Sequence, residues 1–244
     1  MIELAGRAAL VTGAGRRIGQ AIALALGARG MRVLVHYNGS AEGAHETARR
    51  IRDAGGLATT MQADLSDLSA AERLVDRAVD AEGDLFALVN SAAIMVRTPV
   101  GDTTMRAWED MFALNVRAPY FLAQRAAPAL RSARGAIVNI ADLAAFETWP
   151  AYVPHAMTKA AIVQMTRGLA HALAPDVRVN AVAPGVVLLP DAWGEEDAER
   201  LRATTPLQRL GTPEDVAGAV LYLLEADYVT GEVLTVDGGR RIRT

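Results

Sequence analysis

Short apolar segments alternate with stretches of helical periodicity along the whole chain, and this alternation restricts the possible folds more than any other feature. Segments with the length and apolar character of strands lie at 8–11, 33–35, 58–61, 85–89, 136–140, 177–182 and 233–236. The fourth of them shows no alternation of apolar and polar residues, as expected for a strand covered on both faces. Helical patterns separate the strands, which favours parallel pairing through crossover connections. We therefore predict that residues 1–244 form a single α/β domain, a doubly wound parallel sheet of about seven strands with helices on both faces.

Some helix boundaries can also be placed from the sequence. Pro213 follows Thr212 and precedes two acidic residues, which is typical of a helix start. A long helix is expected over 105–130 and another after Pro154. The stretch 188–205 is the least regular part of the chain, and we interpret it as a lid over a ligand near the ends of the strands.

The composition argues against several classes of function. The net charge is −3 and no long basic run is present, so we expect no nucleic-acid partner. The chain contains no cysteine, and its four histidines have no metal-ligand spacing, so we expect no metal site. No apolar run approaches the ~18 residues of a membrane span, and no secretory signal is visible. These features predict a cytoplasmic protein that does not associate with membranes.

A glycine-rich turn connects the first strand to the first helix. Glycine at such a turn lets the backbone approach a pyrophosphate closely, and the helix N-terminus supplies free N–H groups and a positive dipole end. Three residues separate Gly15 from Gly19, so the spacing is not G-x-G-x-x-G. Its place between strand and helix nevertheless predicts a dinucleotide site of the Rossmann type. The turn consists of Thr12, Gly13, Ala14, Gly15, Arg16, Arg17, Ile18 and Gly19.

The end of the second strand indicates which dinucleotide is bound. An acidic residue there would bind the ribose 2′-hydroxyl of NAD and repel the 2′-phosphate of NADP. The residues present are His36, Tyr37, Asn38, Gly39 and Ser40, none of which is acidic. Arg17, with Arg16 as a second candidate, can supply a guanidinium to a phosphate, and Ser40 can add a hydroxyl. We therefore predict binding of NADPH in preference to NADH.

Further motifs follow along the chain: Asp64-Leu65, Asn90-Ser91-Ala92-Ala93, Asn115, Pro184-Gly185 and Val236-Asp237-Gly238-Gly239. Together with the glycine turn, these motifs resemble those of the short-chain dehydrogenase/reductase family, in the same order and over the whole chain. The resemblance implies that these segments and Val187 surround a nicotinamide cofactor, and that Asn115 belongs to a proton relay. It also implies an oxidoreductase that reduces a C=O, C=N or C=C bond of a small organic substrate such as a ketone, quinone or pteridine.

Within that family, pteridine reductases look most similar. Gly13 to Gly19 with Arg17, then His36-Tyr37 and Ser40, resemble their NADPH site. Asp142 stands where most family members have a catalytic serine and where pteridine reductases have an aspartate. Met95 stands where pteridine reductases stack the pterin on a phenylalanine, and a thioether is a poorer stacking surface.

The chain departs from the family at the proton donor. The family's active site is Tyr-x-x-x-Lys, whose lysine contacts the nicotinamide ribose and lowers the pKa of the tyrosine. Lys159 matches the lysine, but His155 stands at the position of the tyrosine.

Three interpretations of this departure are open. In the first, His155 is the acid, since an imidazolium can donate a proton near neutral pH. In the second, Tyr152 and Lys159 form the Tyr-x6-Lys pair that resembles enoyl-thioester reductases of the same superfamily, which requires the helix to begin early. In the third, proton transfer is lost and the protein is a catalytically impaired, NADPH-binding regulator.

The candidate substrate pocket is mostly apolar, as small-molecule sites tend to be. Arg97 could contact an anionic or carrier-linked substrate at its edge. Large apolar residues crowd the helices around Trp108 and Ile162, through which family members commonly associate, and we predict a homotetramer with a dimer as the alternative. The pocket candidates are Met95, Arg97, Phe146, Trp149, Tyr152, Leu188, Leu189 and Trp193.

Overall fold

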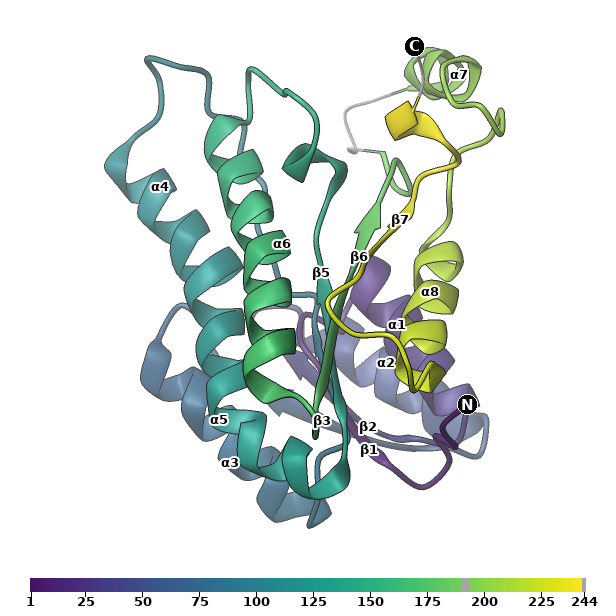
Figure 1. The fold of residues 1–244 in the computed structure, drawn as a ribbon. Helices are drawn as coiled ribbons and strands as arrows, with labels where there is room; N and C mark the ends of the chain where they lie inside the picture. The colour runs from purple at the N-terminus through teal and green to yellow at the C-terminus, as the bar shows by residue number, and fades with distance from the viewer. Residues whose placement is uncertain (190–193, 243–244) are drawn as a thin grey trace.

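The computed structural model, which describes residues 1–189 and 194–242, contains a sheet of seven parallel strands in the order β3-β2-β1-β4-β5-β6-β7 (Figure 1). The sheet is doubly wound, because the chain runs outward from β1 to β3 and then returns to continue from β4 to β7. This confirms the fold predicted from the alternation of segments. The strands are β1 (Ala8–Val11), β2 (Arg32–Tyr37), β3 (Leu57–Gln62), β4 (Ala87–Asn90), β5 (Ala136–Ile140), β6 (Arg178–Pro184) and β7 (Val233–Val236).

Helices cover both faces of the sheet (Figure 1). On one face lie α1 (Arg17–Ala28), α2 (Ala41–Asp53) and α8 (Pro213–Glu225). On the other lie α3 (Leu68–Glu82), α5 (Ala118–Ala133) and α6 (Val153–Leu173), with α4 (Met105–Phe112) leading into α5. None of the helices in the described ranges is long and apolar enough to cross a membrane.

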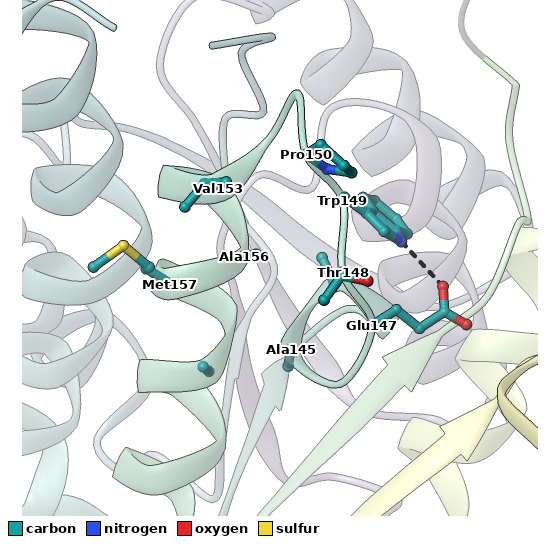
Figure 2. A pocket seen from close by; sticks show the side chains of 10 residues that line it. Ala145, Glu147, Thr148, Trp149, Pro150, Val153, Ala156 and Met157 are labelled. Atoms are coloured by element: carbon teal, nitrogen blue, oxygen red, sulfur yellow. Dashed lines mark hydrogen bonds between the residues drawn. The ribbon is translucent and has the colours of Figure 1, made fainter. Parts of the chain in front are cut away.

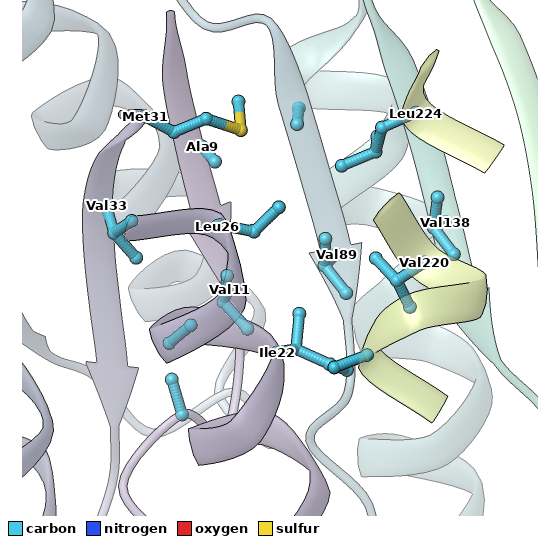
Figure 3. Close-up of a cluster of buried hydrophobic side chains, with 14 of the residues drawn as sticks. Ala9, Val11, Ile22, Leu26, Met31, Val33, Val89, Val138, Val220 and Leu224 are labelled. Atoms are coloured by element: carbon cyan, nitrogen blue, oxygen red, sulfur yellow. The ribbon is translucent and has the colours of Figure 1, made fainter. Parts of the chain in front are cut away.

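A separate hydrophobic core fills each space between sheet and helices. In the core drawn in Figure 3, Ile22 and Leu26 of α1 pack with Val220 of α8 over the central strands. All three side chains are fully buried, and each such burial stabilises the fold by about 1.5–3 kcal/mol. Successive strand residues point to opposite faces, so Val89 serves this core while Leu88 serves the other. The packed sheet is therefore a rigid support for the loops at its ends.

The structure changes two of the expected boundaries. The helix expected over 105–130 is interrupted by a π-helical turn, η1 (Ala113–Arg117). The stretch 188–205, expected to be irregular, contains α7 (Glu195–Ala203), whose first turn is acidic and whose last turn is basic. Such charges stabilise a short helix through its dipole. Trp193 lies among residues 190–193, outside the described residues.

The helix starting at Pro213 is confirmed. Thr212 is its N-cap, and the side chains of Thr212 and Asp215 each accept a hydrogen bond from the other residue's backbone N–H. This capping box satisfies backbone donors that the first helical turn leaves without partners.

Candidate active site

The carboxyl ends of β1, β2, β4, β5 and β6 meet at one edge of the sheet, where open α/β folds bind their ligands. The glycine turn follows β1 at this edge. Gly13 has φ +66°, and a Cβ there would lie 2.9 Å from the Cα of Ala92. A Cβ on Gly19 would lie 2.3 Å from the carbonyl oxygen of Gly13. Both positions therefore need glycine for the turn to close.

Thr12 connects this turn to the loop after β4. Its side chain is buried, and its Oγ1 accepts hydrogen bonds from the N–H of Ser91 at 2.9 Å and of Ala92 at 3.0 Å. The Thr12 hydroxyl also donates to the carbonyl of Val89. The sequence analysis placed Thr12 in the turn and gave it no role, although a lone hydroxyl at the end of an apolar strand is a usable signal.

The turn also packs closely on the start of α2. A Cβ on Gly15 would lie 2.7 Å from Ser40 Oγ, and a Cβ on Gly43 would lie 2.1 Å from the Gly15 carbonyl oxygen. The structure therefore brings Ser40 beside the glycine turn, as the predicted phosphate site requires. Arg16 and Asn38 are exposed at the surface nearby.

Arg17 adopts an unusual backbone conformation at the first residue of α1. Its φ is +54°, in the left-handed region that favours glycine. Ile18 and Tyr37 are half-buried, and both pack against the core.

Asp64 and Leu65, which the resemblance places around the cofactor, follow β3. Asp64 Oδ1 accepts hydrogen bonds from both the N–H and the hydroxyl of Ser66, which lower the pKa of that carboxyl. The side chain of Leu65 is buried in the hydrophobic core that also contains Leu88, on the face of the sheet covered by α3 and α5.

At the end of β6, the backbone approaches the C-terminal segment closely. Pro184 is buried, and the Gly185 N–H donates to the carbonyl of Val236 at 2.8 Å. A Cβ on Gly185 would lie 2.7 Å from the Cα of Asp237. Val187 is half-buried against the first core.

A chain of buried amides and hydroxyls runs inward from the end of β4. Asn90 Nδ2 donates to Asn139 Oδ1, and Asn139 Nδ2 donates to Thr166 Oγ1, each at 2.9 Å. Asn90 Oδ1 has no partner among the described residues. The sequence analysis included Asn90 in the cofactor site but missed Asn139 and Thr166, which lie within otherwise apolar segments.

Asn115 lies in the π-helical turn, a feature often found at functional sites. Its amide makes reciprocal hydrogen bonds with the backbone of Ile94, at 2.9 and 2.8 Å. Asn115 Nδ2 also donates to Thr158 Oγ1 at 3.1 Å, and that hydroxyl donates to the His155 carbonyl at 2.7 Å. Asn115 therefore connects the loop after β4 to the first turns of α6.

Lys159 is buried on α6, with only 5% of its surface exposed. Its Nζ donates to the carbonyl of Ile140 at the end of β5, at 2.9 Å. Burial lowers the pKa of Lys159, because the charged ammonium loses hydration, and the nearby negative charge of Asp142 opposes this shift.

His155 lies one helical turn before Lys159 and is 2% exposed. Neither ring nitrogen has a hydrogen-bond partner among the described residues, and Nε2 lies 3.5 Å from Asp142 Oδ2. The other oxygen of Asp142 accepts the N–H of Ala144, which starts the short helical turn η2 (Leu143–Ala145). A buried imidazole without partners is costly to the fold, and such groups require an explanation.

Tyr152 is the N-cap of α6 and lies outside the helix proper. Its ring makes an edge-to-face contact with Trp149, with centroids 6.3 Å apart. The early helix start that would place Tyr152 and Lys159 on one helical face is not observed.

An apolar groove of about 310 Å³ lies beside this site (Figure 2). Trp149, Val153 and Met157 contribute to its walls, and neither His155 nor Lys159 lines it. Figure 2 shows Val153 and Met157 on the side of α6 that faces away from β5. The groove is therefore separate from the proposed reacting centre.

The other candidate pocket residues lie around the same edge of the sheet. Met95 is 48% exposed, Arg97 is exposed, and Leu188 and Leu189 are half-buried. The guanidinium of Arg241 lies over the ring of Phe146, and its Cζ is 4.2 Å from the ring centroid.

Comparison with known proteins shows which family this chain resembles. Residues 13–241 match a family model described as enoyl-(acyl carrier protein) reductase. The chain is similar to ketoacyl reductase 2 of the granaticin polyketide synthase of Streptomyces violaceoruber, with 41% identity covering 96% of each chain. It is also similar to 3beta-hydroxysteroid dehydrogenase 1 of Eggerthella lenta, with 36% identity covering 97% of this chain and 94% of that one.

A solved short-chain dehydrogenase/reductase of Serratia marcescens, studied as a double mutant, superimposes with a TM-score of 0.92. The two sequences are 34% identical, and the superposition covers 98% of this chain and 100% of the Serratia chain. The chain belongs to the short-chain dehydrogenase/reductase family. As a short-chain dehydrogenase/reductase it is an oxidoreductase for small-molecule substrates, and the family binds a nicotinamide cofactor.

Proposed function

We propose that this short-chain dehydrogenase/reductase uses NADPH to reduce a C=O bond of a small organic substrate, with His155 as the proton donor. One observation supports the proposal: His155, one helical turn before Lys159, is buried, its two ring nitrogens have no hydrogen-bond partner among the described residues, and Nε2 lies 3.5 Å from the carboxylate of Asp142. The similarity to ketoacyl and hydroxysteroid enzymes supports a carbonyl substrate.

The residues at the glycine turn fit a phosphorylated dinucleotide. Gly13 and Gly15 leave the turn free of side chains, and Ser40 lies beside it. No acidic residue occurs between Tyr37 and Ser40, and the exposed Arg16 and Arg17 supply positive charge. These features support NADPH over NADH, because an acidic residue would repel the 2′-phosphate that arginine binds.

In the proposed reaction, different residues of the chain donate the proton, carry the opposing charge and position the cofactor. The cofactor, when bound, would supply the hydride for the carbonyl carbon. The protonated ring of His155 donates its proton to the carbonyl oxygen, which leaves an alcohol and a neutral imidazole. The carboxylate of Asp142 lies 3.5 Å from Nε2 of this ring and carries the opposite charge. Lys159, whose Nζ donates to the Ile140 carbonyl, would hold the ribose of the cofactor, while Asn115 and Thr158 fix the first turns of α6.

Steady-state oxidation of NADPH tests the proposal, with a panel of diketones, 3-oxoacyl thioesters, quinones and pterins. We expect turnover of at least one carbonyl substrate, a loss in His155→Ala of about 10²–10⁴-fold in kcat, and near-normal activity in Tyr152→Phe. The reverse pattern in these two variants would overturn the role of His155. Tight NADPH binding by an otherwise inactive wild type would favour the regulator.

A second candidate is reduction of the C=C bond of an enoyl thioester with Tyr152 as donor. The description of the matching family model favours it. A crotonyl thioester in the same assay separates the two, because the second candidate requires turnover that Tyr152→Phe abolishes.

Several finer properties remain proposals. The exposed Met105 on α4 and Met157 on α6 support association through these helices into a homotetramer or a dimer, which light scattering tests. We also propose that α7 forms part of a substrate lid and that the protein acts in the cytoplasm. A pteridine-like ring is one proposed substrate class. The exposed thioether of Met95 makes pterin stacking the weakest of these.

A further inference from the structure

The imidazole of His36 bridges two of the loops that form the cofactor edge. His36 Nδ1 accepts the N–H of Gly13 at 3.1 Å, and Nε2 lies 3.1 Å from the carbonyl oxygen of Ala63. Gly13 follows β1 and Ala63 follows β3, while His36 belongs to β2 between them. One side chain therefore joins the ends of three adjacent strands.

These contacts determine the state of the ring. Because Nδ1 accepts a hydrogen bond, the ring proton must be on Nε2, which donates to Ala63. The side chain is 2% exposed, and burial lowers the pKa of His36 to about 4, so the ring is neutral near neutral pH. Both nitrogens are thus engaged inside the protein, and the ring has no free polar atom to offer a cofactor.

We propose that His36 is a positioning residue, which sets the shape of the glycine turn and through it the affinity for NADP(H), without contacting the cofactor. The inference rests on the proposed binding of that cofactor. The backbone supports the ring, since the Ala14 N–H donates to the His36 carbonyl at 2.8 Å. Consecutive residues of the turn are therefore held by one residue of β2.

Gly13 is the residue that most needs such support. It has a φ of +66°, and without His36 its half-buried N–H would lose its partner. A partly buried N–H without a partner is costly, so the turn would shift to hydrate it. A displacement of about 1 Å in groups that position a ligand can reduce the rate of the reaction at that site roughly 100-fold.

Matched variants separate the two hydrogen bonds. In His36→Asn, Oδ1 occupies the position of Nδ1 and can accept the Gly13 N–H. In His36→Gln, the longer amide reaches the position of Nε2 and leaves Gly13 unpaired. His36→Leu removes both hydrogen bonds while keeping an apolar side chain of similar volume.

Calorimetry with NADP⁺ gives the first readout. We expect the Kd of His36→Asn to stay within about threefold of wild type, and the Kd of His36→Gln and His36→Leu to rise roughly 10- to 100-fold. In steady-state assays the KM for NADPH should rise with the Kd in His36→Gln and His36→Leu, and any fall in kcat should be smaller than this rise, whereas a general loss of folding would lower kcat without raising KM. Equal binding by the Asn and Gln variants, or wild-type binding by His36→Leu, would overturn the inference. If His36→Leu does not fold, the comparison of Asn with Gln decides.

Hydrogen exchange of the Gly13 amide gives a readout that needs no cofactor. We expect protection in the wild type and in His36→Asn, and faster exchange in His36→Gln. Equal protection in all of them would also overturn the inference. A wild type that protects Gly13 but takes up no NADP⁺ would instead refute the proposed function and leave the supporting contact in place.

Discussion

Gly19→Ala tests whether the close approach within the glycine turn is needed. The new Cβ would lie 2.3 Å from the carbonyl oxygen of Gly13, and that oxygen belongs to the backbone, so no flexible side chain can yield. Relief of such a contact requires a shift of about 1 Å, and overpacking of this kind costs about 1–3 kcal/mol. The same substitution improves helix propensity by about 1 kcal/mol, so the net loss of stability should be modest.

Gly218→Ala is the matched control. Gly218 also lies inside a helix, α8, but a Cβ there meets nothing within 4 Å. This variant should gain about 1 kcal/mol of unfolding free energy, because only the propensity term applies. The difference between the two variants isolates the cost of the contact in the turn.

The assays are urea unfolding and calorimetric titration with NADP⁺. We expect Gly19→Ala to be about 1–3 kcal/mol less stable than Gly218→Ala. Its affinity for NADP⁺ should fall roughly 100-fold, since the displaced carbonyl belongs to the turn proposed to bind the pyrophosphate. Equal stabilities, or unchanged affinity in a folded Gly19→Ala, would show that the turn can relax and that the contact does not constrain it.

Three further predictions follow from individual contacts. Below pH 6.5 the unfolded chain protonates His36, while the folded chain does so only near pH 4. Lowering the pH across that interval should therefore reduce the unfolding free energy of the wild type by about 3 kcal/mol more than that of His36→Asn, as measured by urea unfolding. Thr212→Ala should cost about 1 kcal/mol of unfolding free energy through loss of the cap, and equality with wild type would mean that the capping box is not needed. His155→Phe should abolish turnover and raise thermal stability by removing buried nitrogens that lack partners; a lower melting temperature would show that the contact with Asp142 stabilises the fold.

The fold could be predicted because most strands are both apolar and short, while the crossovers between them have helical periodicity. Apolar pattern and turn chemistry agree at most boundaries, as at Thr212 and Pro213, where the capping box is observed. The pattern did not reveal the π-helical turn at Ala113–Arg117, because such turns are rare and no particular residue type marks them. It also missed the helix Glu195–Ala203, whose evidence lies in its terminal charges and not in an apolar stripe.

The candidate site was predicted as a set of positions but not as a set of contacts. Lys159, His155, Asp142 and Asn115 do gather at the carboxyl ends of the strands, which their places in the sequence indicate. Their partners could not be predicted, because Ile140 and Ala63 contribute backbone carbonyls, which every residue type carries. Contacts of this kind become visible only when strands far apart in sequence are placed side by side.

The departures at residues 142 and 155 are better understood together than singly. A tyrosine donor is neutral before it gives up its proton, and a hydroxyl partner such as serine suits it. A buried cation needs a nearby negative charge, and only 2% of His155 is exposed. The Asp142 carboxylate, held 3.5 Å from Nε2 by its hydrogen bond to the Ala144 N–H, supplies that charge. The proposed role of His155 as the acid therefore depends on Asp142, and it predicts that Asp142→Ser alone impairs catalysis more than it disturbs the fold.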